Sequence, residues 1–337
     1  MDNVTVVETH IAVSNVTVTA TSSVSPTAQA IITLVYMFGL LGNTTALYYL
    51  LSPKSKPRNP RHVLLLTMLL VNDLTAVMGM WVQMNISLHL KSIAHTKAFC
   101  SVRVLWRAFG LGSGCIVSVM AMERWLALTR PFYYTKYVTV SCLRKGTYIL
   151  LLINLTIVCM PFFGFGAYYN DKTNTCVRYK SATRPIDVAY AYVYMTFGTM
   201  LCLSLVVCNF WVIISLTMNY KAGKKHPQVL VRRHSRNRDL VASSTEEEKT
   251  FARVMVFISV IFVASWLPQL ASVPIARFVD AATCKKYFRI ADIVLACHFI
   301  IDPYVYILQK YFRPSQWCRK PNSRTSSVKT SNEMCSL

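Results

Sequence analysis

Seven apolar stretches run through this chain, and each is long enough to cross a lipid bilayer as a helix. About 20 residues at 1.5 Å rise span a hydrocarbon layer of roughly 30 Å. No water satisfies backbone groups at that depth, so helices are the economical way to cross. The sequence predicts an all-α membrane protein, a bundle of seven transmembrane helices near residues 28–51, 63–88, 100–128, 146–168, 188–218, 251–278 and 288–309.

Composition excludes a soluble domain of this size. Hydrophobic residues make up 54% of the 337 residues, charged residues only 15%, and the mean hydropathy is positive. No second folded domain is expected. The predicted organisation is an exposed N-terminal tail over 1–27, the helix bundle over 28–309, a short juxtamembrane helix over 310–318 and a disordered tail over 319–337.

The net charge of +22 could suggest a nucleic-acid partner, but the basic residues cluster between the spans. They are concentrated at 54–61, 221–238 and 310–329. By the positive-inside rule these segments are cytoplasmic, so the C-terminus lies inside, the N-terminus outside, and no nucleic acid is expected. Glycosylation sequons at Asn3 and Asn15 on the predicted outer side agree with this orientation.

Most of the eleven cysteines lie in apolar stretches, where they act as small hydrophobic residues. Cys100 begins the third span and Cys176 follows the fourth, both on the oxidising face, so a disulfide between them is predicted. Cys318 follows a basic and aromatic stretch after the last span, which suits palmitoylation; a free thiol is the alternative.

Polar residues inside the spans mark functional positions, because burying them in hydrocarbon is costly. Asp73, Ser113 and Asp302 are expected to meet, near Asn43 and His298. Two facing carboxylates rarely both ionise without a cation, so we expect either a sodium ion or a shared proton there. A hydrogen-bonded clamp between helices is the plainer alternative.

A switch is predicted at the cytoplasmic end. Arg124 is adjacent to Glu123 and could reach Glu248 at the start of the sixth span, which would hold two helices together. The alternative is that 246–248 is a solvated acidic run. Farther along the sixth span, Pro268 beside Trp266 predicts a hinge, or simply a kinked and packed helix.

These residues carry a family resemblance. Gly42-Asn43, Asn72-Asp73-Leu74, Cys100, Glu123-Arg124, Trp266-Leu267-Pro268 and the run from Asp302 to Tyr306 resemble, in order and spacing, the motifs of rhodopsin-like G-protein-coupled receptors. The resemblance covers nearly the whole chain. It implies a multi-pass plasma-membrane receptor with a short amphipathic eighth helix, heterotrimeric G protein and arrestin as partners, and a role for Tyr306 in switching.

Within that superfamily, several stretches are similar to prostanoid receptors. They are Asp302-Pro303, the segments 160–166, 192–195, 207–209 and 126–134, and above all 133–138, which most resembles prostaglandin E receptors of type 4. This resemblance implies prostaglandin E2 or a related prostanoid as ligand and a rise in cyclic AMP as the response.

Two departures limit the match. The family has aromatic residues on both sides of the loop cysteine, where this chain has Thr175 and Val177. The family's ligand-anchoring arginine corresponds to Ile293; Arg289 lies four residues earlier, about one helical turn. Asp292 is close enough in sequence to neutralise Arg289.

An acidic lipid would need a basic anchor and an apolar slot, since arginine holds a carboxylate with paired hydrogen bonds. The alternative for the basic side chains is contact with membrane lipid headgroups. The predicted ligand-binding residues are Arg103, Arg107, Thr175, Met195, Trp266 and Arg289.

Other functions are disfavoured by missing groups. No Asp near Trp106 could hold a monoamine, and no Lys within 288–309 could form a retinal Schiff base. The His residues are scattered, so no metal-dependent enzyme and no cofactor beyond the sodium ion are expected. A receptor for another lipid acid or a small peptide remains the nearest alternative, and a transporter is the alternative from another class.

Overall fold

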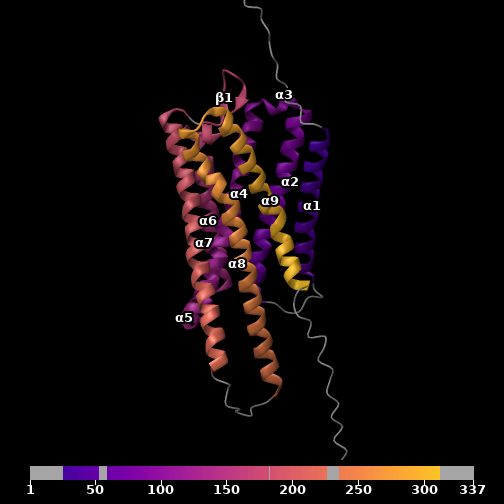
Figure 1. Cartoon of the computed structure of the whole chain (residues 1–337), viewed down its shortest axis with the longest axis vertical. Helices are drawn as coiled ribbons and strands as arrows, with labels where there is room; N and C mark the ends of the chain where they lie inside the picture. The colour runs from indigo at the N-terminus through magenta and orange to yellow at the C-terminus, as the bar shows by residue number, and fades with distance from the viewer. Residues whose placement is uncertain (1–25, 53–58, 182, 226–234, 312–337) are drawn as a thin grey trace, which may run out of the picture.

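The computed structural model describes residues 26–52, 59–181, 183–225 and 235–311, and its long helices lie side by side in one bundle (Figure 1). The seven predicted spans are confirmed as helices of membrane-spanning length and composition. They are α1 Pro26–Leu51, α2 Pro60–His89, α4 Lys97–Thr129, α6 Val140–Cys159, α7 Pro185–Lys225, α8 Ser235–Phe278 and α9 Ala281–Tyr311.

The fourth span differs most from its prediction. α6 begins at Val140, because the Thr139 side chain caps it by accepting a hydrogen bond from the Cys142 backbone N–H at 3.1 Å. It continues as the 3₁₀ helix η1 Met160–Phe163 and ends at Gly164, whose φ of 88° is accessible to glycine. The predicted residues 164–168 are therefore not helical.

Short elements complete the chain. They are α3 Lys91–Ala94, α5 Pro131–Tyr137, the antiparallel strands β1 Tyr169–Asn170 and β2 Thr175–Cys176, and the 3₁₀ helix η2 Tyr179–Ser181. The predicted glycosylation sites Asn3 and Asn15, the palmitoylation site Cys318 and most of the predicted juxtamembrane helix lie outside the described residues.

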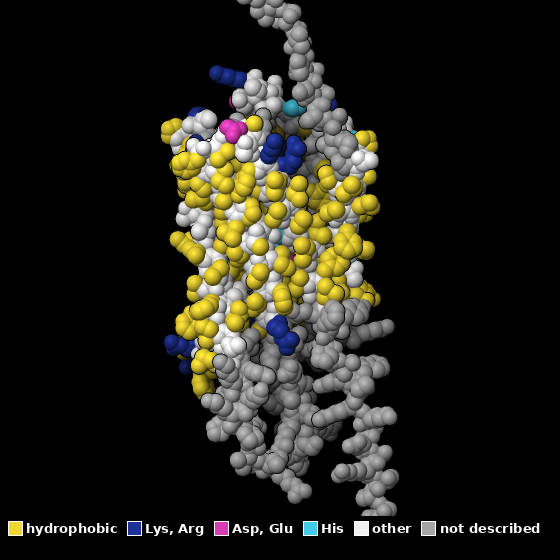
Figure 2. All heavy atoms as spheres, in the orientation of Figure 1, with side chains coloured by type: hydrophobic (Ala, Val, Ile, Leu, Met, Phe, Trp, Pro, Cys, Tyr) yellow, Lys and Arg dark blue, Asp and Glu magenta, His cyan; other side chains and the backbone are white. Residues whose placement is uncertain are grey.

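Side-chain distribution agrees with a bundle embedded in lipid. Hydrophobic side chains cover the middle of the face shown in Figure 2, and charged side chains lie toward its two ends. Large apolar side chains such as Phe210, Val260 and Leu152 are at least 60% exposed. A soluble protein would not expose so continuous an apolar surface.

α4 is the central helix of the bundle. Of its most apolar window 67% is buried, compared with 22% for α1. Every residue from 110 to 121 is buried. α2 approaches α4 so closely at Gly79 that an added Cβ atom would lie 1.8 Å from the Trp106 ring, so only glycine fits.

Polar side chains clamp neighbouring helices together. Asn72 donates to the Phe109 carbonyl at 2.9 Å, and Asn154 to the Ala108 carbonyl at 2.7 Å. At the other side of the bundle, Asn43 donates to the Phe299 carbonyl at 3.0 Å. Side-chain bonds of this kind hold helices in lipid, where apolar burial alone does not drive them together.

The strands belong to the segment 164–184, which we call the hairpin segment. The predicted disulfide is confirmed: Cys176 in β2 is bonded to Cys100 in α4, with Cα atoms 5.3 Å apart. This bond fixes the hairpin segment to the central helix at the end of the bundle where β1 and α3 lie (Figure 1).

We expect Cys100→Ala and Cys176→Ala each to reduce surface delivery, because either change releases the hairpin segment from α4. A native disulfide typically contributes about 2–4 kcal/mol. The double variant should be no worse than either single variant, as measured by surface labelling of intact cells. Cys142→Ala, which removes an exposed free thiol, is the control and should match wild type. Losses that add in the double variant would show that the two residues do not act as a unit.

Candidate functional site

The hairpin segment turns into the bundle after its disulfide. Beyond Cys176 the chain forms η2, in which Tyr179 and Lys180 are 8% and 4% exposed. Tyr179 packs on Tyr194 of α7, with ring centroids 4.8 Å apart. Because the disulfide bond holds Cys176 against α4, the residues that follow place one aromatic and one basic side chain between the helices.

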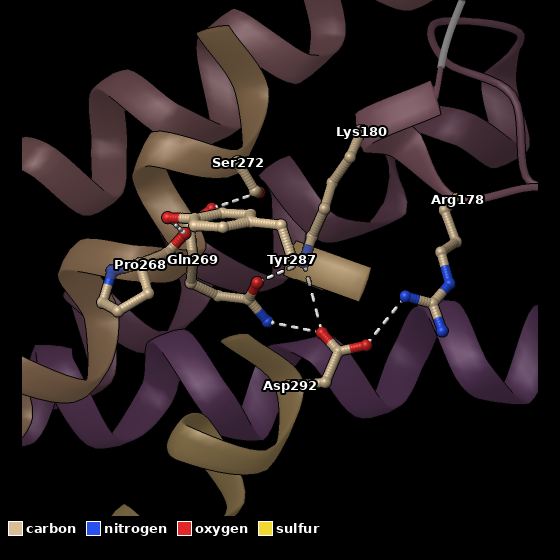
Figure 3. Close-up of polar contacts among 7 residues, drawn as sticks. All are labelled: Arg178, Lys180, Pro268, Gln269, Ser272, Tyr287 and Asp292. Carbon is tan, nitrogen blue, oxygen red and sulfur yellow. Dashed lines mark hydrogen bonds and ion pairs between the residues drawn. The ribbon is translucent and has the colours of Figure 1, made fainter. Parts of the chain in front are cut away.

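Lys180 lies among groups from α8 and α9 (Figure 3). Its ammonium donates to the side-chain oxygen of Gln269 and to Asp292 Oδ1, the latter at 3.2 Å. Gln269 Nε2 donates to the same Asp292 oxygen at 2.9 Å. The Phe288 ring centroid is 5.1 Å from the ammonium, so an aromatic face covers it.

Burial sets the protonation of this lysine. Desolvation lowers the pKa of Lys180 to about 8. The negative charge of Asp292 raises this pKa, and the positive charges of Arg178 and Arg107 lower it further. At neutral pH the side chain therefore still carries its charge. Arg178 shares the same carboxylate, because its Nη1 lies 2.8 Å from Asp292 Oδ2.

Arg107 in α4 lies over the ring of Tyr179. Its guanidinium carbon is 5.0 Å from the Tyr179 ring centroid, and its Nη1 is buried without a hydrogen-bond partner among the described residues. Arg103, one turn earlier, lies within electrostatic range of Arg107, Arg178 and Asp292. Asp292 thus pairs with Arg178 and Lys180, Arg103 lies within its electrostatic range, and Arg107 lies near Lys180; we call these five residues the charged cluster.

The predicted ligand residues divide into two groups. Arg103 and Arg107 belong to the charged cluster, Trp266 is buried at 1% exposure, and Met195 is half-buried against the core. Thr175 is half-buried in β2, where its hydroxyl and that of Thr173 are 2.7 Å apart.

Arg289 lies apart from the charged cluster. It is exposed on α9, and so is Ile293, one turn further along the same face. Asp292, which is close enough in sequence to neutralise Arg289, pairs instead with Arg178 and Lys180.

Sequence reasoning missed Lys180, Gln269 and Tyr179. The available signal was weak: Lys180 follows the bridged Cys176 by four residues, and Gln269 follows Pro268. Neither spacing has a motif of its own. Their meeting depends on the path of the hairpin segment.

The polar residues expected to meet in mid-bundle do so in part. Ser113 Oγ lies 3.2 Å from His298 Nε2, and His298 Nδ1 lies 3.4 Å from Asp302 Oδ2. Asp73, within electrostatic range of Asp302 and His298, is bonded to Asn72 at 3.2 Å. Asn43 bonds instead to backbone carbonyls of Gly39 and Phe299.

Carboxylate oxygens of this cluster suit a hard cation. Asp73 Oδ2 and both Asp302 oxygens are buried without a hydrogen-bond partner among the described residues. Asp73, Ser113 and Asp302 would be the residues that hold a sodium ion, through oxygen ligands. Within the described part of the chain, no group of three or more His, Cys, Asp or Glu side chains is arranged to hold a metal. Sodium therefore stays a prediction.

At the opposite end of the bundle, Arg124 is held within α4 and by α5. Its Nε and Nη2 donate to Glu123 at 2.5 Å, and both side chains are buried. Tyr134 of α5 donates to Glu123 and accepts from Arg124 Nη2 at 3.2 Å. Burial, followed by the charge of Glu123, raises the pKa of Tyr134 to about 12, so its hydroxyl remains a donor.

Arg124 also meets the start of the sixth span. Its guanidinium carbon lies 5.0 Å from the Phe251 ring centroid, and His62 of α2 stacks on Phe251 at 3.7 Å. Glu248 belongs to the part of α8 whose side chains are outside the described set, so the predicted Arg124–Glu248 latch stays a prediction.

The predicted hinge lies inside α8. Pro268 lies inside the continuous helix, where it offers no backbone N–H, and its carbonyl accepts a hydrogen bond from the Tyr287 hydroxyl at 2.9 Å. Trp266 stacks on Phe262 with centroids 5.6 Å apart. Tyr306 of α9 is half-buried against the core.

Comparison with known proteins identifies the family. The profile described as "7 transmembrane receptor (rhodopsin family)" matches residues 42–306, most of the chain. The chain belongs to this family of receptors. The receptor is thus a multi-pass membrane protein of the G-protein-coupled class. Membership of this family confirms the expectation that the protein is not an enzyme. It also overturns the alternative that the protein is a transporter.

Individual relatives agree with the prostanoid resemblance. The prostaglandin D2 receptor of Homo sapiens is 25% identical over 239 residues, covering 66% of this receptor and 66% of that one. The prostacyclin receptor of Mus musculus is 25% identical over 289 residues, covering 82% and 66%. The receptor therefore spans just under two thirds of the length of these relatives.

Rhodopsins are similar as well. A "Rhodopsin, GQ-coupled" of Mizuhopecten yessoensis is 25% identical over 300 residues, covering 86% of this receptor and 58% of that protein. The crystal structure of squid rhodopsin superposes with a TM-score of 0.66 at 19% identity, covering 83% and 80% of the two chains. This structural likeness shows the seven-helix fold.

We expect Tyr134→Phe to raise ligand-independent signalling several-fold, because the change removes the hydroxyl that bonds both Glu123 and Arg124. Hydrogen bonds to charged groups typically contribute about 1.5–3 kcal/mol. Basal second-messenger levels at matched surface expression measure the effect. Tyr133→Phe, which alters a neighbouring side chain that is 53% exposed, is the matched control. Equal basal signalling in both variants would contradict the role of Tyr134.

Proposed function

We propose that this protein is a receptor for a prostanoid, an acidic lipid, and that it signals through a heterotrimeric G protein. The relatives named above support the ligand class. The observation that carries the proposal is the charged cluster, in which Arg103, Arg107, Arg178 and Lys180 outnumber Asp292. Lys180 is buried and Arg107 is half-buried, and positive charge in excess of the neighbouring negative charge favours an anionic partner.

The cluster adjoins an aromatic wall that suits the rest of a lipid. Tyr179, Tyr190 and Tyr194 pack on one another beside Arg107. A carboxylate on Arg107 would fill the unpaired Nη1 position, and paired hydrogen bonds to a guanidinium are stronger than neutral ones. Lipid chain atoms would then lie against the tyrosine rings and toward Trp266.

Arg107 is a better anchor than Arg289 on this geometry. Arg107 is half-buried and lies near two other cations, Arg103 and Lys180, whereas Arg289 is exposed and suits contact with lipid headgroups. A small acidic peptide or another lipid acid could satisfy the same charges. A retinal ligand is disfavoured, since α9 carries no lysine between 288 and 309.

Signalling would follow a population shift. Ligand bound at the charged cluster favours the arrangement in which α8 swings about Pro268, which frees Arg124 for the G protein. The shift is bounded by the ligand's differential affinity for the two arrangements.

Prostaglandin E2 is the ligand, and a rise in cyclic AMP the response, that the likeness of residues 133–138 to type-4 prostaglandin E receptors supports first. The relatives include receptors named for prostaglandin E2, prostaglandin D2 and prostacyclin.

Placement in the plasma membrane with the N-terminus outside is part of the proposal, supported by the basic loops and by a disulfide at the end bearing the hairpin segment. Serines and threonines between 323 and 331 would be phosphorylated for arrestin binding.

We expect Arg107→Ala to weaken prostaglandin E2 binding about 10- to 150-fold, the loss of a charge-assisted contact of about 1.5–3 kcal/mol. The methyl ester of the ligand should lose less, because it has no carboxylate charge. Competition binding on membranes from expressing cells measures both.

Arg289→Ala is the matched control and should leave the ratio of acid to ester affinity unchanged. An acid-selective loss in Arg289→Ala alone would transfer the anchor to α9, at the position one turn before the family's arginine. If the wild type binds none of the prostanoid acids, the proposed ligand class is wrong.

A further inference from the structure

Asp292 ties three parts of the receptor together (Figure 3). Oδ2 accepts from Arg178 Nη1 at 2.8 Å, and Oδ1 accepts from Lys180 Nζ at 3.2 Å and from Gln269 Nε2 at 2.9 Å. One carboxylate of α9 therefore holds two cations of the hairpin segment, Arg178 and Lys180, and the residue that follows Pro268 in α8.

Those cations are the ones that an acidic ligand would approach. Lys180 and Arg107 both contact the Tyr179 ring, at 6.0 and 5.0 Å from its centroid. A ligand carboxylate held by Arg107 would thus come near Lys180, whose ammonium is already bonded to Asp292 and Gln269. Two carboxylates close together repel each other, so Lys180 cannot bind the ligand carboxylate and Asp292 well at the same time.

We propose that Asp292 is a built-in competitor of the acidic ligand: its carboxylate occupies Lys180 and Arg178, and the ligand binds by displacing it from them. This inference rests on the proposed function, because it takes the ligand to be an acid. It assigns to Asp292 an effect opposite to that of the cations around it.

Displacement of Asp292 would reach the hinge of α8. Gln269 bonds both Lys180 and Asp292, and it directly follows Pro268. The Ser272 hydroxyl donates to the Gln269 carbonyl at 2.5 Å, and the Tyr287 hydroxyl to the Pro268 carbonyl at 2.9 Å. When the ligand carboxylate replaces Asp292 at Lys180, the hydrogen bonds that join the hairpin segment to Gln269, next to Pro268 in α8, are therefore weakened.

The test is Asp292→Asn, which keeps the shape of the side chain and removes its charge. With prostaglandin E2 as the probe, its Kd should fall about 2- to 5-fold, the range for a partly exposed ion pair. The methyl ester should bind as it does to wild type. In Arg178→Gln/Lys180→Gln receptors, the gain from Asp292→Asn should disappear.

Asp280→Asn is the matched control. Asp280 is exposed at the start of α9 and accepts from the Thr283 backbone N–H at 2.9 Å, a role that Asn can fill. This change removes the same charge from the same end of the bundle without touching the hairpin segment. Its acid and ester affinities should match wild type, which separates local competition from a general change in surface potential.

Unchanged or weaker acid binding in Asp292→Asn, relative to Asp280→Asn, would overturn the inference. If wild type binds prostaglandin E2 and Arg107→Ala loses it, the proposed function stands whatever Asp292 does. Absence of specific prostaglandin E2 binding to wild type would refute both. If the Lys180 variant fails to reach the surface, the comparison of Asp292→Asn with Asp280→Asn decides alone.

Discussion

Lack of water in the bilayer core is the constraint on which the rest of this structure depends. Backbone groups must be satisfied within each segment, which leaves helices as the crossing elements. The same lack of water gives polar side chains their weight. Asn43, Asn72 and Asn154 find carbonyl partners on neighbouring helices, so each acts as a clamp.

Charged groups follow the same rule at both ends of the bundle. Glu123 and Arg124 neutralise each other at one end, and Asp292 is shared by Arg178 and Lys180 at the other. Both sites touch α8, through Phe251 at one end and through Gln269 at the other. Pro268 and Trp266 lie in the helix between them. A change of charge at either end is thereby connected to the helix that carries the hinge.

The two ends differ in how their charges balance. Glu123 and Arg124 form a buried pair, and Tyr134 is hydrogen-bonded to both. The charged cluster has an excess of cations, and Arg107 retains a buried nitrogen without a partner among the described residues. An ion pair with balanced charges has no need of a further ion, whereas a cluster with excess positive charge suits the binding of an anion. This difference supports the proposal that the ligand binds at the charged cluster.

The fold class, the spans and the disulfide could be predicted from the sequence, because apolar length and cysteine position are local properties on which lipid and an oxidising face act directly. The sequence also identified Arg107 and Glu123–Arg124 as functional candidates. It could not predict that Lys180 enters the bundle, that Asp292 faces the hairpin segment, or that Arg289 and Ile293 are exposed; these depend on how the helices pack. The path of residues 177–181 and the rotation of α9 about its axis depend on packing among distant segments, and no spacing along the chain encodes either.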